Sequence, residues 1–147
     1  MLPIKLEQIQ LDVDLQTPEE AIRFAGNLLL KTKSIEQSYI EEMVRGFEEL
    51  GPYIVLAPNI AIPHARPEFG VNEQCLAFVR VKKPISFGHP QNDDVQLIIP
   101  IGGIDKNFHI YMLRDLSAIL MDEEKISRLK ESNDKMEIYN ILKGEGQ

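Results

Sequence analysis

A chain of 147 residues with 44% hydrophobic and 27% charged side chains is typical of one globular domain that buries a core without disulfides or metals. Its net charge of −7 excludes a general nucleic-acid binder, because such proteins need a basic face to neutralise phosphates. No apolar run approaches the roughly 20 residues that span a bilayer, and the N-terminal segment is acidic where a signal peptide would be apolar. We therefore expect a single domain over residues 1–147, located in the cytoplasm without direct membrane insertion, whose partners are other proteins.

Two amphipathic helices are expected first along the chain. Thr17-Pro-Glu-Glu20 is typical of a helix start, with a capping threonine, a proline at the first helical position and two acidic residues at the positive end of the dipole. Apolar residues then recur at helical spacing until Lys31 and Lys33. A second stripe of this kind begins after Ser34 and ends at Gly51.

The middle of the chain is rich in short apolar runs, and helical patterns return after it. The runs predict strands over residues 53–56, 59–62, 75–81 and 95–101. The later patterns predict helices that begin at residues 105–107, 122 and 133. This order predicts an α/β fold, with one mixed β-sheet flanked by helices on both sides.

His64 lies in the stretch with the most unusual composition, between Pro63 and Pro67. The two prolines restrict the backbone on both sides of the histidine. A nucleophilic imidazole needs such a fixed ring, whose exposed nitrogen can meet a phosphoryl group in line, and with a pKa of about 6.5 it is largely neutral at cytoplasmic pH. Arg66 could pair with the phosphate or with an acidic partner. The residues alone leave open a plain loop histidine.

His109 is expected in the first turn of the helix after residue 105, on one stripe with Leu113, Leu116 and Leu120, so it should point inward. The N-terminus of a helix disfavours an imidazolium and offers amide donors to an anion. A neutral His109 beside His64 could therefore donate a hydrogen bond to a bound phosphoryl group. A satisfied core histidine is the alternative.

The third histidine, His89, lies in a turn-rich segment over residues 87–94, where a solvated loop histidine is expected. The spacing of the three histidines relative to Asp93 and Asp94 matches no known ligand pattern, so we predict no metal site.

Two further features carry weaker signals. Cys75 lies in an apolar run and is expected to be a buried thiol. The pair Gly102-Gly103, between an expected strand and an expected helix, could cradle a phosphate. The standard phosphate-loop, nucleophile-elbow and dinucleotide-binding motifs are missing from the sequence.

The segment Asn59-Ile-Ala-Ile-Pro-His-Ala-Arg66 resembles the active-site motif of the mannitol/fructose-type (type 2) enzyme IIA domains of the phosphotransferase system (PTS) for sugars. Together with Gly51-Pro-Tyr-Ile-Val-Leu-Ala-Pro58 and Phe87-Gly-His-Pro-Gln-Asn-Asp-Asp94, it is most similar to the ascorbate-specific branch. The chain departs from the family near Gly51-Pro-Tyr53, where many members carry an arginine, a glutamate and then a threonine. Arg45 is therefore not assigned the role of that arginine.

The resemblance implies an enzyme, a phosphotransferase component with a phosphohistidine intermediate and no cofactor. The small protein HPr would donate a phosphoryl group to Nε2 of His64, which would pass it to an enzyme IIB during sugar uptake. His109 matches by position the second histidine of the family's site. The alternatives are a regulatory module whose phosphorylation state is read by a transcription factor or kinase, and a fold relative that only binds.

Overall fold

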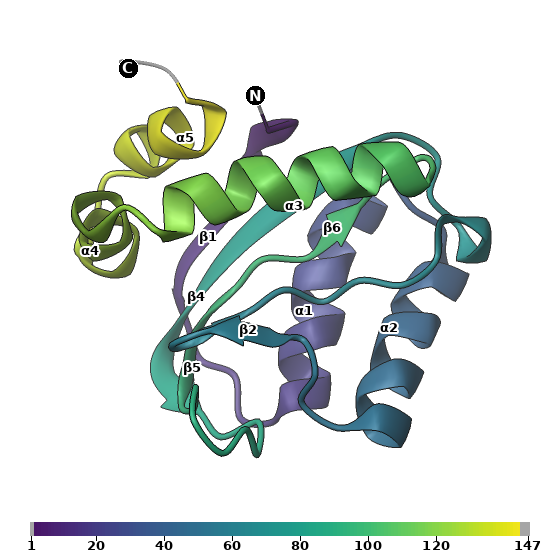
Figure 1. Cartoon of the computed structure of the whole chain (residues 1–147), viewed down its shortest axis with the longest axis horizontal. Helices are drawn as coiled ribbons and strands as arrows, with labels where there is room; N and C mark the ends of the chain where they lie inside the picture. The colour runs from purple at the N-terminus through teal and green to yellow at the C-terminus, as the bar shows by residue number, and fades with distance from the viewer. Residues whose placement is uncertain (1, 145–147) are drawn as a thin grey trace.

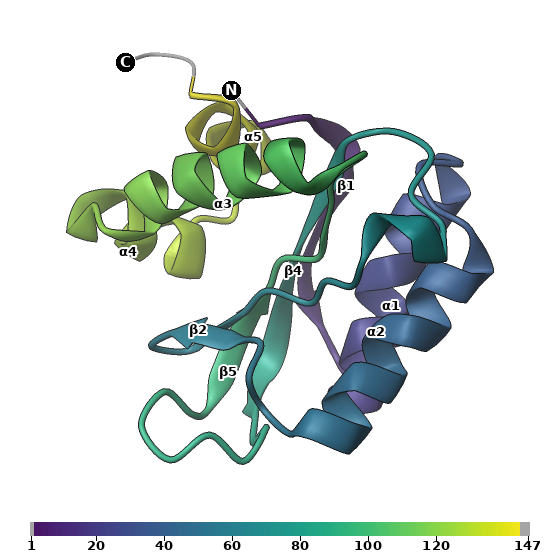
Figure 2. The same ribbon diagram turned by 45° about the vertical axis from the view of Figure 1, so that its right-hand side comes forward.

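The computed structural model describes residues 2–144, and within them a mixed six-stranded sheet carries helices on both faces, as predicted (Figures 1 and 2). Its strands are β1 (Ile4–Val13), β2 (Val55–Ala57), β3 (Ile60–Ala61), β4 (Cys75–Ile85), β5 (Val95–Ile98) and β6 (Ile101–Gly102). Its helices are α1 (Pro18–Lys31), α2 (Gln37–Leu50), α3 (Lys106–Leu120), α4 (Glu123–Glu131) and α5 (Lys135–Lys143), with a short 3₁₀ turn η1 (Pro67–Phe69).

The strand order is β1-β4-β5-β3-β2, and β6 pairs with β4 beside β5. β1 with β4 and β3 with β5 are parallel pairs, whereas β4 with β5 and β2 with β3 are antiparallel. The sheet is therefore mixed. β4 pairs with β1 on one side and with β5 and β6 on the other. Its residues 75–81 are all buried and, apart from Arg80, apolar, because helices cover both of its faces.

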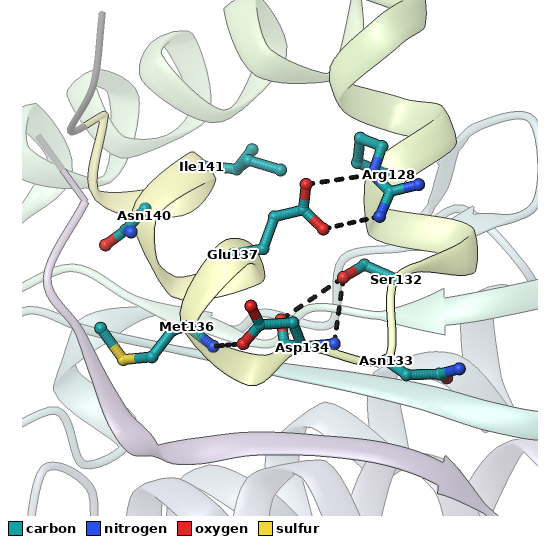
Figure 3. Close-up of a pocket in the computed structure, with 8 residues that line it drawn as sticks. All are labelled: Arg128, Ser132, Asn133, Asp134, Met136, Glu137, Asn140 and Ile141. Carbon is teal, nitrogen blue, oxygen red and sulfur yellow. Dashed lines mark hydrogen bonds and ion pairs between the residues drawn. The ribbon is translucent and has the colours of Figure 1, made fainter.

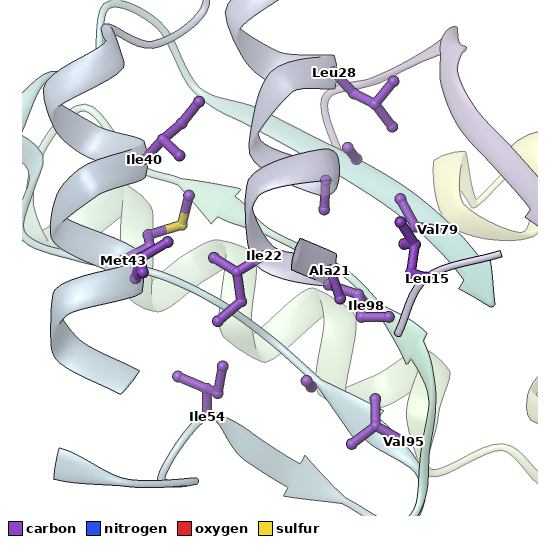
Figure 4. Packing of buried hydrophobic residues seen from close by; sticks show 14 of the residues in the cluster. Leu15, Ala21, Ile22, Leu28, Ile40, Met43, Ile54, Val79, Val95 and Ile98 are labelled. Atoms are coloured by element: carbon purple, nitrogen blue, oxygen red, sulfur yellow. The ribbon is translucent and has the colours of Figure 1, made fainter. Parts of the chain in front are cut away.

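Side chains of β4 alternate between two hydrophobic cores. Ala77 and Val79 belong to the core between the sheet and the helices α1 and α2, which Figure 4 shows. Leu76 and Phe78 belong to the core between the sheet and the helices α3, α4 and α5. Successive side chains of a strand point to opposite faces, so one strand supplies both layers.

The helix starts follow from local capping. The Thr17 hydroxyl accepts a hydrogen bond from Glu20 N at 3.1 Å, with Pro18 in the first position, as predicted. Asp105 caps α3 in the same way, accepting from the amides of the first turn. α2 ends at Gly51, whose φ of 81° is a conformation that glycine adopts without strain.

The strands of the structure differ in several places from those predicted. β1 was not predicted: only Ile4, Gln8 and Ile9 are fully buried in it, so its sequence lacks an alternating pattern. The strand expected over residues 95–101 is interrupted, because Pro100 lacks the N–H that a continuous ladder needs, and β5 and β6 result. β4 continues to Ile85, beyond the predicted end at Val81.

The fold brings two connections together at one end of the sheet. The chain that leaves β3 runs toward η1, and the chain that leaves β6 enters α3 (Figure 2). Ile101 N donates a hydrogen bond to Pro63 O at 3.1 Å, so these connections are directly joined. They carry His64 and His109. None of the helices within residues 2–144 is long and apolar enough to cross a membrane.

Candidate functional site

His64 follows β3 in a segment held from two sides. Ile62 N donates to Ile54 O at 2.8 Å, and Pro63 O accepts from Ile101 N at 3.1 Å. The backbone that precedes His64 is thus bonded to the segment before β2 and to β6, in addition to the restriction imposed by Pro63. The histidine is half-buried at the end of this fixed segment.

The ring of His64 is oriented by its own backbone. Its Nδ1 lies 2.7 Å from the carbonyl oxygen of Ile62. A carbonyl oxygen only accepts hydrogen bonds, so Nδ1 carries the proton and Nε2 of the neutral ring carries the free lone pair. The local geometry therefore makes Nε2 the nucleophilic atom of His64.

Tyr39, a buried residue of α2, fixes the residue after His64. Its hydroxyl donates to Ile101 O at 2.7 Å and accepts from Ala65 N at 3.0 Å, which connects the His64 segment to β6. Burial raises the pKa of Tyr39 well above its usual value, so the hydroxyl stays protonated. The sequence indicated only that Tyr39 belongs to an apolar stripe; nothing local pointed to its two partners.

Tyr39→Phe should lower the free energy of unfolding by about 1–3 kcal/mol, because it leaves Ala65 N and Ile101 O without their hydrogen bonds at an unchanged shape. Urea denaturation of the two proteins measures the difference. Equal midpoints would show that other groups satisfy the two backbone atoms.

His109 lies beside His64, with ring centroids 5.1 Å apart and planes inclined by 49°. It projects from the first turn of α3, as predicted, and it is half-buried. Gly103 permits this position: a Cβ at Gly103 would lie 2.7 Å from His109 N and 2.8 Å from its Cα. The close approach of the loop to the helix is therefore a packing reason for this glycine.

Burial, with a smaller effect of the neighbouring His64, lowers the pKa of His109 below 6.5. Its Nδ1 is buried and has no hydrogen-bond partner within the described residues. An unpaired buried N–H is costly, whereas an unpaired lone pair is tolerated better, so the proton belongs on Nε2. His109 is then a neutral ring with one N–H to donate.

The pKa of His109 should rise in His64→Ala but remain below about 6.5, because burial is the larger of the two causes. NMR titration of the imidazole resonances measures both values. A wild-type pKa of His109 above that of a free histidine would contradict the assignment of a neutral, buried ring.

Since the unfolded chain binds this proton more tightly, His109 should also make the folded protein less stable as the pH falls below about 6.5.

A groove of about 370 Å³ opens beside His64. It is lined by Glu42, Arg45, Gly46, Glu49, Leu50, Tyr53, His64, Ala65, Arg66 and Phe69. Tyr53 packs against His64, with ring centroids 5.8 Å apart and planes at 80°. The imidazole of His64 thus contacts two rings, those of Tyr53 and His109.

The two arginines of the groove differ in their surroundings. Arg45 pairs with Glu42 and, at 2.7 Å, with Glu49 on the same helix. Arg66 is exposed at the start of η1 and forms no ion pair with another residue of the range 2–144. Arg66 is therefore the groove's uncommitted cation, while Arg45 is largely neutralised by its own helix.

His89 lies outside the groove and has a structural role in the loop over residues 87–94. His89 is half-buried, and its Nδ1 accepts hydrogen bonds from Gln91 N at 3.1 Å and Asn92 N at 3.0 Å. The expectation of a freely solvated loop histidine was therefore wrong, because the ring closes a turn. The Asp93 carboxylate accepts from the amides of Phe87, Gly88 and His89 in the same loop.

Cys75 is buried, as predicted, and burial raises the pKa of its thiol to about 12. No group of three or more potential metal-binding side chains occurs in the described part of the chain.

A second hollow lies between α4 and α5 (Figure 3). Its polar side chains already have partners close by: Arg128 pairs with Glu137, and Ser132 and Asp134 accept hydrogen bonds from backbone amides of the same turn.

The fold and the paired histidines define a small α/β protein with a fixed, nucleophilic imidazole beside a groove. The model of the family "Phosphoenolpyruvate-dependent sugar phosphotransferase system, EIIA 2" matches residues 3–145, so this chain belongs to the type 2 enzyme IIA family. It is therefore a phosphotransferase component of the sugar PTS.

Three relatives illustrate the range of the family. The ascorbate-specific PTS EIIA component of Escherichia coli K12 is 32% identical over 137 residues, covering 92% of this chain and 89% of the relative. The solved complex of enzyme IIA-MTL with phosphorylated enzyme IIB-MTL from E. coli matches with a TM-score of 0.83 and 33% identity, covering 96% and 99% of the two chains. The nitrogen regulatory protein IIA-Ntr of Neisseria meningitidis matches with a TM-score of 0.80 and 25% identity, covering 95% of each chain. The predicted fold and family are confirmed.

Proposed function

We propose that this chain is a cytoplasmic phosphoryl carrier, which accepts a phosphoryl group from phospho-HPr on Nε2 of His64 and passes it to an enzyme IIB during coupled sugar uptake. The observation that carries the proposal is the 2.7 Å hydrogen bond between His64 Nδ1 and Ile62 O. It leaves Nε2 as the free nucleophile before any donor arrives, so no proton has to be removed from the attacking atom.

Each transfer exchanges one bond to phosphorus for another. The Nε2 lone pair forms the new N–P bond while the bond between phosphorus and the donor atom breaks, and the leaving atom keeps that electron pair. The ring gains positive character, which the Nδ1–H bond to Ile62 O stabilises. The second step repeats this exchange with His64 as the leaving group and an enzyme IIB side chain as the nucleophile.

His109 and Arg66 would act on the phosphoryl oxygens. The neutral ring of His109 has a donor at Nε2, and its centroid lies 5.1 Å from that of His64. Arg66, two residues after His64 and in the lining of the same groove, offers a charged donor to the phosphate or to an acidic side chain of a partner. Donors placed where charge is carried stabilise it without reorganisation.

Exposed apolar side chains around the two histidines support docking of other proteins. The groove contributes Leu50, Tyr53 and Phe69, and α3 contributes Phe108, Ile110 and Tyr111, each at least 37% exposed. A gathering of apolar side chains beside a reactive group is typical of a transient protein interface. The IIA-MTL relative forms a complex with phosphorylated enzyme IIB, which supports an enzyme IIB as acceptor here.

We infer further that ascorbate is the sugar served by this relay, on the strength of the 32% identity to the ascorbate-specific component. We also treat residues 1–147 as one enzyme IIA domain, since the family match covers residues 3–145 and a single sheet runs through the chain. Neither inference requires a cofactor or a metal.

The relay is tested by incubating the purified protein with phosphoenolpyruvate, enzyme I and cognate HPr, followed by intact mass spectrometry. We expect an acid-labile gain of one phosphoryl group that disappears when the ascorbate-type enzyme IIB is added. No gain in the folded protein would overturn the carrier function. A stable phosphoprotein that enzyme IIB does not discharge would favour the regulatory module.

A further inference from the structure

Tyr53 is a groove residue that the sequence left without a role. Its ring packs nearly perpendicular to that of His64, with the centroids 5.8 Å apart. It lines the same groove as Arg45 and Arg66, so its side chain borders the space that a group on His64 would enter.

The Tyr53 hydroxyl is held in place by packing, but it has no hydrogen-bond partner within residues 2–144. It lies against α2 at Gly46, where an added Cβ would be only 3.0 Å from the phenol oxygen, so the missing side chain of Gly46 makes room for it. Within residues 2–144 the hydroxyl forms no hydrogen bond, and the residue is 39% exposed. A tyrosine hydroxyl that lies in the groove beside a reactive histidine and has no partner is available to a ligand.

We propose that the Tyr53 hydroxyl donates a hydrogen bond to the phosphoryl group carried on His64, which makes Tyr53 a further catalytic residue of the relay. The proposal rests on the proposed function of His64. A phosphoryl group presents three strong acceptor oxygens, more than the single N–H of His109 can satisfy. Arg45, the nearest cation on α2, is already occupied by two glutamates.

A phenol suits this position because it donates without adding charge to the groove. Burial raises the pKa of Tyr53, so the donor proton stays in place at cytoplasmic pH. The hydroxyl therefore distinguishes the phosphorylated from the free state by hydrogen bonding alone, and it imposes no repulsion on a cationic side chain of a partner.

The test compares wild type with Tyr53→Phe after chemical phosphorylation by phosphoramidate, which needs no HPr. The pH titration of the phosphohistidine phosphorus NMR signal gives the pKa of the phosphoryl group. A hydrogen bond to the dianion lowers this pKa, so Tyr53→Phe should raise the midpoint by about 0.3 to 1 pH unit, a two- to tenfold loss of acidity. The phenylalanine keeps the ring contact with His64, so a purely structural role would leave the midpoint unchanged.

Tyr139→Phe is the matched control, because it removes a hydroxyl from a half-buried tyrosine of α5, outside the groove, and should not move the midpoint. Equal midpoints in wild type and Tyr53→Phe would overturn the role of Tyr53 and leave the carrier function standing. A folded wild type whose His64 takes no phosphoryl group from phosphoramidate would overturn the carrier function and the role of Tyr53 with it.

Discussion

His64→Ala should reduce phosphorylation of this chain by HPr to below about a thousandth of the wild-type rate, because the substitution removes the nucleophilic atom itself. The fold should survive. The imidazole is half-buried and its hydrogen bond goes to Ile62, two residues away in the same segment, so its loss disconnects no distant element. Stopped-flow transfer from phospho-HPr measures the rate, and urea denaturation verifies the free energy of unfolding.

His89→Ala serves as the control for this variant, because it also removes a half-buried histidine but at a turn outside the groove. It should accept the phosphoryl group at close to the wild-type rate, even where the loss of two hydrogen bonds lowers its stability. Phosphorylation that persists in His64→Ala and disappears in His89→Ala would identify His89 as the acceptor and contradict the site described above.

Arg80→Ala should lower the free energy of unfolding by about 3–5 kcal/mol, because it removes the centre of a buried polar network. The Arg80 side chain is 3% exposed and pairs with the Asp12 carboxylate at 3.0 Å. Its guanidinium also donates to Ser132 O at 2.7 Å and to Leu129 O and Asn133 Oδ1 at 3.3 Å. It thus ties β4 to the end of β1 and to the turn between α4 and α5. Chemical denaturation measures the loss.

Two variants separate burial from charge in this network. Asp12→Asn should cost much less than Arg80→Ala, because Asp12 is 55% exposed and the carbonyl partners of the arginine remain. Lys82→Ala, at an exposed position of the same strand, should have a negligible effect. An Arg80→Ala protein as stable as Lys82→Ala would show that water replaces the guanidinium at the carbonyl groups.

What depends on neighbours in the chain was predictable from the sequence. The cap at Thr17, the end of α2 at Gly51 and the stiffened segment around His64 each follow from a few adjacent residues, and the structure bears out the helices that they delimit. The apolar run of β4 likewise predicted a strand covered on both faces. The resemblance to type 2 enzyme IIA domains added the family, which the comparisons confirmed.

Contacts between distant segments were decided by the tertiary structure alone. β1 has little alternation and becomes a strand by pairing with β4, some seventy residues away in register, for example Ile9 with Phe78. Arg80 sits in an apolar strand as a satisfied buried cation, because residues from β1 and from the α4–α5 turn converge on it. Local periodicity reports which side of an element is apolar, but it does not report what packs there.

The same division applies to the site. The sequence by itself determined that His64 would be held in a restricted backbone and that His109 would begin a helix and face inward. Only the tertiary structure decided that Tyr39 anchors Ala65 to β6 and that Tyr53 packs against the His64 ring. The physical reason is that a side chain's protonation, orientation and availability depend on its partners, and folding brings those partners from separate parts of the chain.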